Sequence, residues 1–124
     1  MLLNDFYRIT DEQLIQEVPA RFQFTLEINS SHRIFEGHFP GSPVVPGVCL
    51  AEIIRELTGQ ILARPVDLVG ANYIKFISVV NPLNHPNITV EIKINQQDAP
   101  EIQAESTIFA QHIIFLKFKG TFRS

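Results

Sequence analysis

A histidine and a glutamate fourteen positions apart (52 − 38 = 14) are the residues whose types and spacing could support acid–base chemistry. His38 lies in the Gly/Pro-rich stretch from Gly37 to Pro46, and Glu52 lies in the apolar segment that follows. An imidazole and a carboxylate with separated pKa values can act as general base and general acid. A helix beginning at Gly47 would present unpaired backbone N–H groups, which favour negative charge that develops nearby. The pattern permits proton transfer beside an oxyanion.

A simpler interpretation of the same two residues needs no chemistry. A lone histidine in a loop more often packs or forms hydrogen bonds, and Glu52 lies nearly opposite the apolar face of its helix, where a solvated glutamate would lie. Spacing alone therefore does not make either residue catalytic.

The segment carrying Glu52 is predicted to be a helix from Gly47 to Ala63, because Leu50, Ile54, Leu57 and Ile61 follow helical spacing. Strict alternation predicts a half-buried strand over Arg21 to Ile28. Upstream, Thr10 with Gln13 three residues later predicts the start of a helix that Pro19 ends. Four further strands are expected, at 67–80, 87–96, 101–109 and 112–122.

One helix among several long strands predicts the α+β class, with an antiparallel sheet wrapped around a central helix. The length of 124 residues and the hydrophobic fraction of 45% fit a single globular domain covering 1–124. The expected core includes the single thiol, Cys49, and six of the ten phenylalanines, which are Phe22, Phe24, Phe76, Phe109, Phe115 and Phe118.

Charge and cysteine content narrow the function classes. A net charge of −3 argues against a general nucleic-acid binder. One cysteine forms neither an internal disulfide nor a Cys-rich metal site, and His32, His85 and His112 lack the spacing of metal ligands, so no metal site is expected. No segment reads as a secretory signal or a membrane span. The expectation is a cytoplasmic protein without membrane contact.

The stretch Glu36 to Val48, EGHFPGSPVVPGV, resembles the signature of the FabZ-type 3-hydroxyacyl-acyl-carrier-protein dehydratases, hotdog-fold enzymes related to the FabA type. In that family the motif reads approximately GHFPGxPxxPGV, and an acidic residue follows the histidine by fourteen positions. The resemblance implies a hotdog domain that converts a 3-hydroxyacyl thioester to a trans-2-enoyl thioester without a cofactor. It implies that His38 is the catalytic base and Glu52 the catalytic acid. Gly47 would hold the thioester carbonyl, with Val48 beside it.

The resemblance also implies two kinds of partner. Family members form homodimers in which the histidine of one subunit works with the acid of the other, and a trimer of such dimers is a further arrangement. The substrate would arrive on an acidic acyl carrier protein, which needs a local basic patch on this acidic chain. Arg64 and Lys75 are the chosen docking residues, and Lys117, Lys119 and Arg123 are the alternative.

Departures from the family pattern keep two other functions open. Glu56 replaces the usual glutamine one turn after the acid, and like charges one turn apart tend to raise the pKa of one of them. Arg55 could compensate, or could pair with Glu52 and disarm it. A hotdog thioesterase would use Glu52 to activate water. A non-catalytic acyl-binding or scaffold subunit would instead pair with an active paralogue.

Overall fold

The structure, a computed structural model, describes residues 1–36, 43–98 and 100–124. His38 lies outside these ranges. In chain order the described elements are β1 (Tyr7–Gln16), β2 (Ala20–Ile28), the 3-10 helix η1 (Arg33–Phe35), α1 (Gly47–Leu62), β3 (Asp67–Phe76), β4 (Asn87–Asp98), β5 (Glu101–Ala110) and β6 (Ile113–Arg123). The helix and the strands predicted from Arg21 onward are confirmed, with ends that shift by a few residues.

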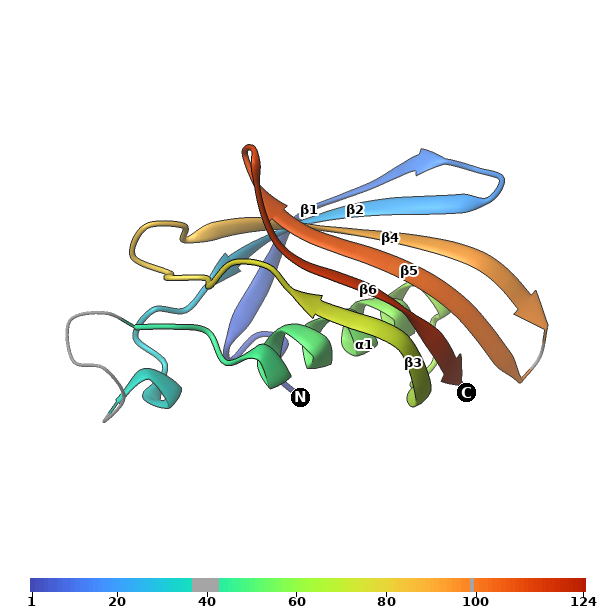
Figure 1. Cartoon of the computed structure of the whole chain (residues 1–124), viewed down its shortest axis with the longest axis horizontal. Coiled ribbons are helices and arrows are strands. Elements are labelled where there is room, and N and C mark those ends of the chain that lie inside the picture. The colour runs from blue at the N-terminus through green and yellow to red at the C-terminus, as the bar shows by residue number, and fades with distance from the viewer. Residues whose placement is uncertain (37–42, 99) are drawn as a thin grey trace.

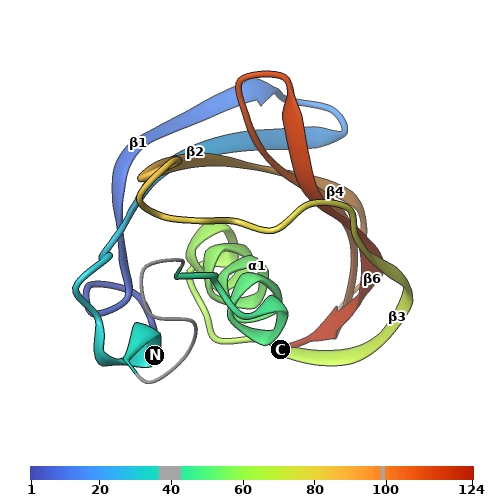
Figure 2. The ribbon, with the colours of Figure 1, turned by 60° about the vertical axis from the view of Figure 1, so that its left-hand side comes forward.

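The strands form one antiparallel sheet in the order β1-β2-β4-β5-β6-β3. The sheet curves around α1, which lies along its concave face (Figures 1 and 2). This is the α+β arrangement that the sequence predicts. It places β3 at one edge of the sheet and β1 at the other.

The core forms where the helix meets the concave face of the sheet. Leu50, Ile53, Ile54 and Leu57 are at most 2% exposed, and each such side chain contributes about 1.5–3 kcal/mol relative to an exposed position. In β5 every second residue, from Ile102 to Ala110, is buried. The intervening side chains point to the convex outer face, so the period-2 pattern of the sequence fixes which face meets the helix.

The helix predicted to start at Thr10 is wrong, because this segment belongs to β1. β1 pairs with β2 from Tyr7 to Gln16 and is mostly exposed. A Thr/Gln capping pattern stabilises a helix only slightly. Without β1, the edge of β2 would have a row of unpaired backbone N–H and C=O groups. Pairing of that edge outweighs the local helix signal.

One predicted core residue lies at the surface. Phe24, Phe115 and Phe118 are buried, and Phe22 and Phe109 are half-buried, but Phe76 is 59% exposed. Phe76 is the last residue of β3, an edge strand, where the sheet no longer covers the inward-facing side chain. Cys49 is buried as predicted, and burial raises the pKa of its thiol.

Candidate active site

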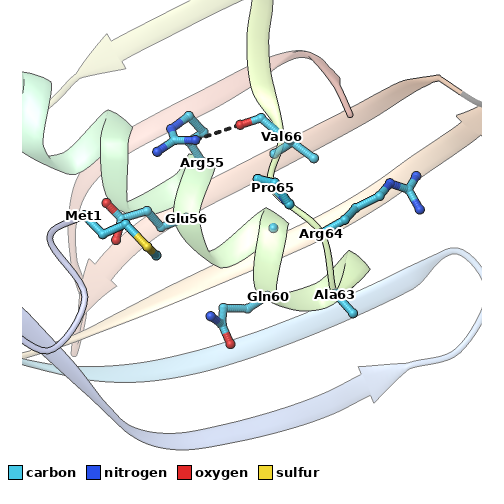
Figure 3. A pocket seen from close by; sticks show the side chains of 9 residues that line it. Met1, Arg55, Glu56, Gln60, Ala63, Arg64, Pro65 and Val66 are labelled. Atoms are coloured by element: carbon cyan, nitrogen blue, oxygen red, sulfur yellow. Dashed lines mark hydrogen bonds between the residues drawn. The ribbon is translucent and has the colours of Figure 1, made fainter.

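Glu52, the predicted acid, is held by Arg55 one helical turn later on α1. The Arg55 guanidinium donates from Nε to Glu52 Oε1 at 2.8 Å and from Nη2 to Oε2 at 2.6 Å. Its third nitrogen, Nη1, donates to the backbone carbonyl of Val66 at 2.8 Å, a contact drawn in Figure 3. The ion pair is thereby fixed between the helix and the chain that leads into β3.

This contact sets the electrostatics of Glu52. The hydrogen bonds from Arg55 hold the pKa of the Glu52 carboxyl below its usual range, against partial burial, which favours the neutral form. The expected repulsion from Glu56 does not govern Glu52, because a charge-assisted, two-pronged pair outweighs a like charge one turn away. Of the alternatives for Arg55, the structure selects direct pairing with Glu52.

Glu56 is a buried anchor rather than a solvated neighbour of Glu52. It is 4% exposed, and its carboxylate accepts hydrogen bonds from the backbone N–H groups of Leu2 and Leu3, both at 2.9 Å. The hydroxyl of Tyr7 donates to the same carboxylate at 3.1 Å. Burial, together with the negative charge of Glu56, raises the pKa of Tyr7 far above its ordinary value. Glu56 therefore ties the N-terminal segment to α1.

Gly47 is the first residue of α1, and Pro46 before it forms no side-chain cap. The first N–H groups of a helix have no partner within it, so this end can accept negative charge. Gly47 borders a pocket of about 400 Å³ that is lined mainly by apolar residues at 44–47 and 76–79, with Leu50. A Cβ atom at Gly47 would lie 2.6 Å from Cε1 of Phe76. Only glycine allows the ring to lie this close.

Val48, predicted beside Gly47 in the substrate site, is 76% exposed. Its position after Gly47 at the start of the helix leaves its side chain outside the core. The structure therefore brings Gly47 together with Phe76 and the apolar pocket, and places Val48 at the surface.

The two predicted docking residues do not lie together. Arg64 follows α1 and borders a separate pocket of about 510 Å³ that also includes Arg55, Glu56 and Val66 (Figure 3). Lys75 lies at the far end of β3, where its Nζ is 4.7 Å from the centre of the Tyr73 ring. At the rise of a strand, Asp67 and Lys75 are about 26 Å apart. One small patch cannot include both Arg64 and Lys75.

Within the described ranges 1–36, 43–98 and 100–124, no group of three or more His, Cys, Asp or Glu side chains could hold a metal ion. None of the helices in the same ranges has the length and apolar character needed to cross a membrane.

The curved sheet around one helix, with a Gly-started helix bordering an apolar pocket, defines a hotdog-fold protein. Solved structures share this fold. An uncharacterized protein from Erwinia carotovora subsp. atroseptica matches with a TM-score of 0.66 at 15% identity, covering 93% of this chain and 92% of that one. The dehydratase heterocomplex ApeI:P from Xenorhabdus doucetiae matches with a TM-score of 0.65 at 17% identity, covering 94% and 96%.

The chain belongs to the ApeI-like family, described as ApeI dehydratase, whose family model matches residues 14–113. A curated FabZ 3-hydroxyacyl-[acyl-carrier-protein] dehydratase from Syntrophobacter fumaroxidans is 28% identical over 120 residues, covering 90% of this chain and 74% of the relative. The FabZ protein from Ruegeria is 38% identical over 89 residues, 56% of this chain and 54% of the relative. A FabZ protein from Rhizobium rhizogenes is 47% identical over 47 residues, 38% of this chain and 29% of the relative. This chain therefore spans about half or less of the length of these last two.

Proposed function

We propose that this protein removes water from a 3-hydroxyacyl thioester carried by an acyl carrier protein and releases a trans-2-enoyl thioester. The observation that carries this proposal is the position of Gly47, whose helix-start N–H borders an apolar pocket of about 400 Å³. A thioester carbonyl at this N–H would direct its acyl chain into the pocket. Membership of the dehydratase family supports the same reaction.

The reaction divides between the predicted base and acid. His38 takes the α-proton of the thioester, and the resulting enolate charge develops at the carbonyl oxygen beside the Gly47 N–H. Glu52, in its protonated form, donates a proton to the 3-hydroxyl as the carbon–oxygen bond breaks. The products are the enoyl thioester and water, so protons balance once His38 returns its proton to Glu52 through solvent. No cofactor is required by this scheme.

We infer that two copies of the chain form a homodimer and share their sites. β3 is an edge strand with one row of unpaired backbone groups, and Leu68 and Val69 on it are 42% and 50% exposed. Exposed apolar edge strands are templates for pairing with another chain. Pairing of two β3 edges would cover these residues and bring the α1 helices of both copies to one interface. His38 of one copy would then work with Glu52 of the other.

One observation favours a second function, hydrolysis of the thioester. Dehydration needs a protonated Glu52, whereas Arg55 favours the carboxylate. A carboxylate can instead take a proton from water as the water oxygen attacks the thioester carbonyl, and the departing thiolate is then protonated. For dehydration to proceed, the bound substrate must weaken the Arg55 contact. A third alternative is a scaffold subunit that becomes part of an active site only with a second hotdog chain.

One assay separates these functions. The purified protein is mixed with crotonyl and octenoyl thioesters of carrier protein, and enoyl absorbance and free thiol are followed together. Loss of absorbance without thiol release, caused by hydration in the reverse direction, is expected and supports the dehydratase. Thiol release at an equal rate would establish hydrolysis instead. Turnover that appears only after a second hotdog protein is added would establish the scaffold role. Glu52→Gln is the control for activity from a contaminating enzyme.

A further inference from the structure

The convex outer face of the sheet carries two kinds of cation. One kind is neutralised by a carboxylate on the neighbouring strand. These pairs are Arg8–Glu27 at 2.7 Å, Arg21–Glu91 at 2.9 Å, Lys93–Glu105 at 3.9 Å and Arg123–Glu101 at 2.7 Å. Each joins two adjacent strands, so most of this face is electrically balanced.

The second kind is a group of three lysines, Lys75, Lys117 and Lys119, here called the β3–β6 lysine patch. All three lysines are exposed. No carboxylate oxygen of the described side chains lies within ion-pair distance of any of the three. Glu105 lies opposite Lys119 in the register, but its carboxylate accepts from Asn95 at 2.7 Å and pairs with Lys93. The patch therefore retains its positive charge.

The register concentrates this charge. Lys75 lies directly opposite Lys117, and Tyr73 lies opposite Lys119 (β3 beside β6 in Figure 1). Like charges directly opposite each other destabilise a sheet pair. The contact of Lys75 with the Tyr73 ring is a weak compensation at an exposed site. The repulsion between Lys75 and Lys117 opposes folding, whereas the four ion pairs balance other cations on the same face. This contrast favours a surface that binds a negatively charged partner.

The patch also lies beside the proposed active site. Lys75 immediately precedes Phe76, whose ring lies against Gly47 at the start of α1. β3 ends there, and the following residues, 77–79, border the apolar pocket. A molecule bound to the patch is therefore around the end of one strand from the pocket mouth. Because the patch is on the face of the sheet, pairing of the β3 edge would leave it accessible.

We propose that the β3–β6 lysine patch docks an acidic carrier protein that delivers the acyl thioester to the Gly47 pocket. This inference rests on the proposed carrier-bound substrate and assigns its docking surface to Lys75, Lys117 and Lys119 rather than to Arg64. An anionic membrane fits less well, because lipid-binding clusters usually contain about 4–8 cations. The net charge of −3 also leaves no general attraction to polyanions. Local charge of this kind chiefly steers encounter with a complementary partner.

The test compares two triple variants that remove the same charge. Lys75→Gln/Lys117→Gln/Lys119→Gln neutralises the patch. Arg8→Gln/Lys93→Gln/Arg123→Gln removes three cations of the same face that are already paired. Binding of a purified, fluorescently labelled holo acyl carrier protein is measured by anisotropy at low and high salt. This readout needs no turnover, so it tests docking separately from the reaction.

The patch variant should bind the carrier about tenfold more weakly at low salt and lose most of its salt dependence. The paired-cation variant should bind within about twofold of the wild type. Thermal unfolding should show no loss of stability in the patch variant, because removing Lys75 and Lys117 relieves their repulsion. If the wild type binds carrier but turns over no thioester, the proposed reaction fails while the docking surface stands.

Three outcomes would overturn the docking surface. One is equal weakening in both triple variants, which would mean that net charge alone matters. Another is unchanged carrier binding in the patch variant. The third is that the wild type binds no carrier but co-sediments with vesicles containing 30% anionic phospholipid, and that the patch variant does not co-sediment. This result would assign the patch to a membrane.

Discussion

Arg55 and Glu52 form a two-pronged ion pair within one turn of α1, with hydrogen bonds of 2.8 and 2.6 Å. The remaining nitrogen of Arg55 is bound to the Val66 carbonyl, so the guanidinium is held from both sides. A planar guanidinium matches an ionised carboxylate, whose single negative charge is shared by its two oxygens. Arg55 therefore favours the carboxylate form of Glu52, although the proposed dehydration needs the protonated form. Under the proposed function, Arg55 would determine which reaction Glu52 can support.

The first prediction is that Arg55→Gln shifts the pH dependence of catalysis. Loss of the guanidinium lets the pKa of Glu52 rise toward its ordinary range. In dehydration the working form of Glu52 is protonated, so the alkaline limb of the pH–rate profile should move to higher pH and the rate near neutral pH should increase. The measurement is kcat against pH. Arg21→Gln, which breaks an ion pair of similar exposure on the outer face, should leave the profile unchanged.

A shift of the acidic limb, in place of the alkaline limb, would identify the hydrolase. If Glu52 works as a carboxylate, Arg55→Gln should move the acidic limb upward and reduce activity below neutral pH.

The same ion pair also couples pH to folding. Because the folded-state pKa of Glu52 is depressed, its contribution to stability is present above the unfolded pKa and is lost as pH falls through the folded value. The melting temperature of the wild type should therefore fall as the pH drops from the unfolded to the folded pKa of Glu52. The melting temperature of Arg55→Gln should fall less over the same pH interval.

The elements that carry the site follow from local patterns, which is why the sequence predicts them. The spacing of Leu50, Ile54 and Leu57 predicts a helix with one apolar face that packs against a sheet. The alternation of apolar and polar residues predicts strands that bury one face. The helix start predicted at Thr10 and the core position predicted for Phe76 are wrong for the same physical reason, since both residues lie in edge strands. In an edge strand, backbone pairing and side-chain exposure depend on which strands lie beside it, and local sequence patterns do not reveal that order.

The contacts of the site divide in the same way. Pairing of Arg55 with Glu52 is local, three positions apart on a helix, and is one of the alternatives that the sequence offers. The partners of Glu56 lie 49 to 54 positions away, so no spacing rule could connect them. The grouping of Lys75 with Lys117 needs the β3–β6 register, which only the folded sheet provides.

The second prediction is that Glu56→Ala destabilises the fold by about 2–4 kcal/mol, because three donors lose their acceptor in a buried site. Glu56→Gln keeps one carbonyl oxygen as an acceptor and should cost less. Tyr7→Phe removes one of the three hydrogen bonds and should cost about 1 kcal/mol. Chemical denaturation of the three variants gives the order. Equal stability of Glu56→Ala and the wild type would show that the N-terminal segment is not anchored by this carboxylate.

The third prediction concerns sites shared between two copies. His38→Ala and Glu52→Gln should each be inactive yet dimeric. Refolding an equal mixture should restore about a quarter of the wild-type rate, because half of the dimers are mixed and each has one intact site. The dehydration assay on the mixture, with each parent alone as control, measures this. A mixture that stays inactive, although size exclusion shows mixed dimers, would place both residues of each site in one subunit.

The fourth prediction tests the bare backbone of Gly47. Gly47→Ala places a Cβ 2.6 Å from the position of Cε1 of Phe76, so the ring must move. Phe76 is 59% exposed, so its ring can move toward solvent, and alanine favours a helix over glycine. We therefore expect a melting temperature close to that of the wild type, but kcat/KM at least tenfold lower, because the displaced ring or the new methyl obstructs the helix-start N–H.

The double variant Gly47→Ala/Phe76→Ala separates these two causes. If the displaced ring causes the loss, removing it should restore most of the kcat/KM, while Phe76→Ala alone stays near the wild type. If the methyl itself blocks the thioester carbonyl, the double variant should remain as slow as Gly47→Ala. Full activity of Gly47→Ala alone would contradict both, since the N–H of residue 47 would then not need an open approach. Steady-state kinetics with a pantetheine thioester suits all three variants, because this small substrate bypasses docking to the lysine patch.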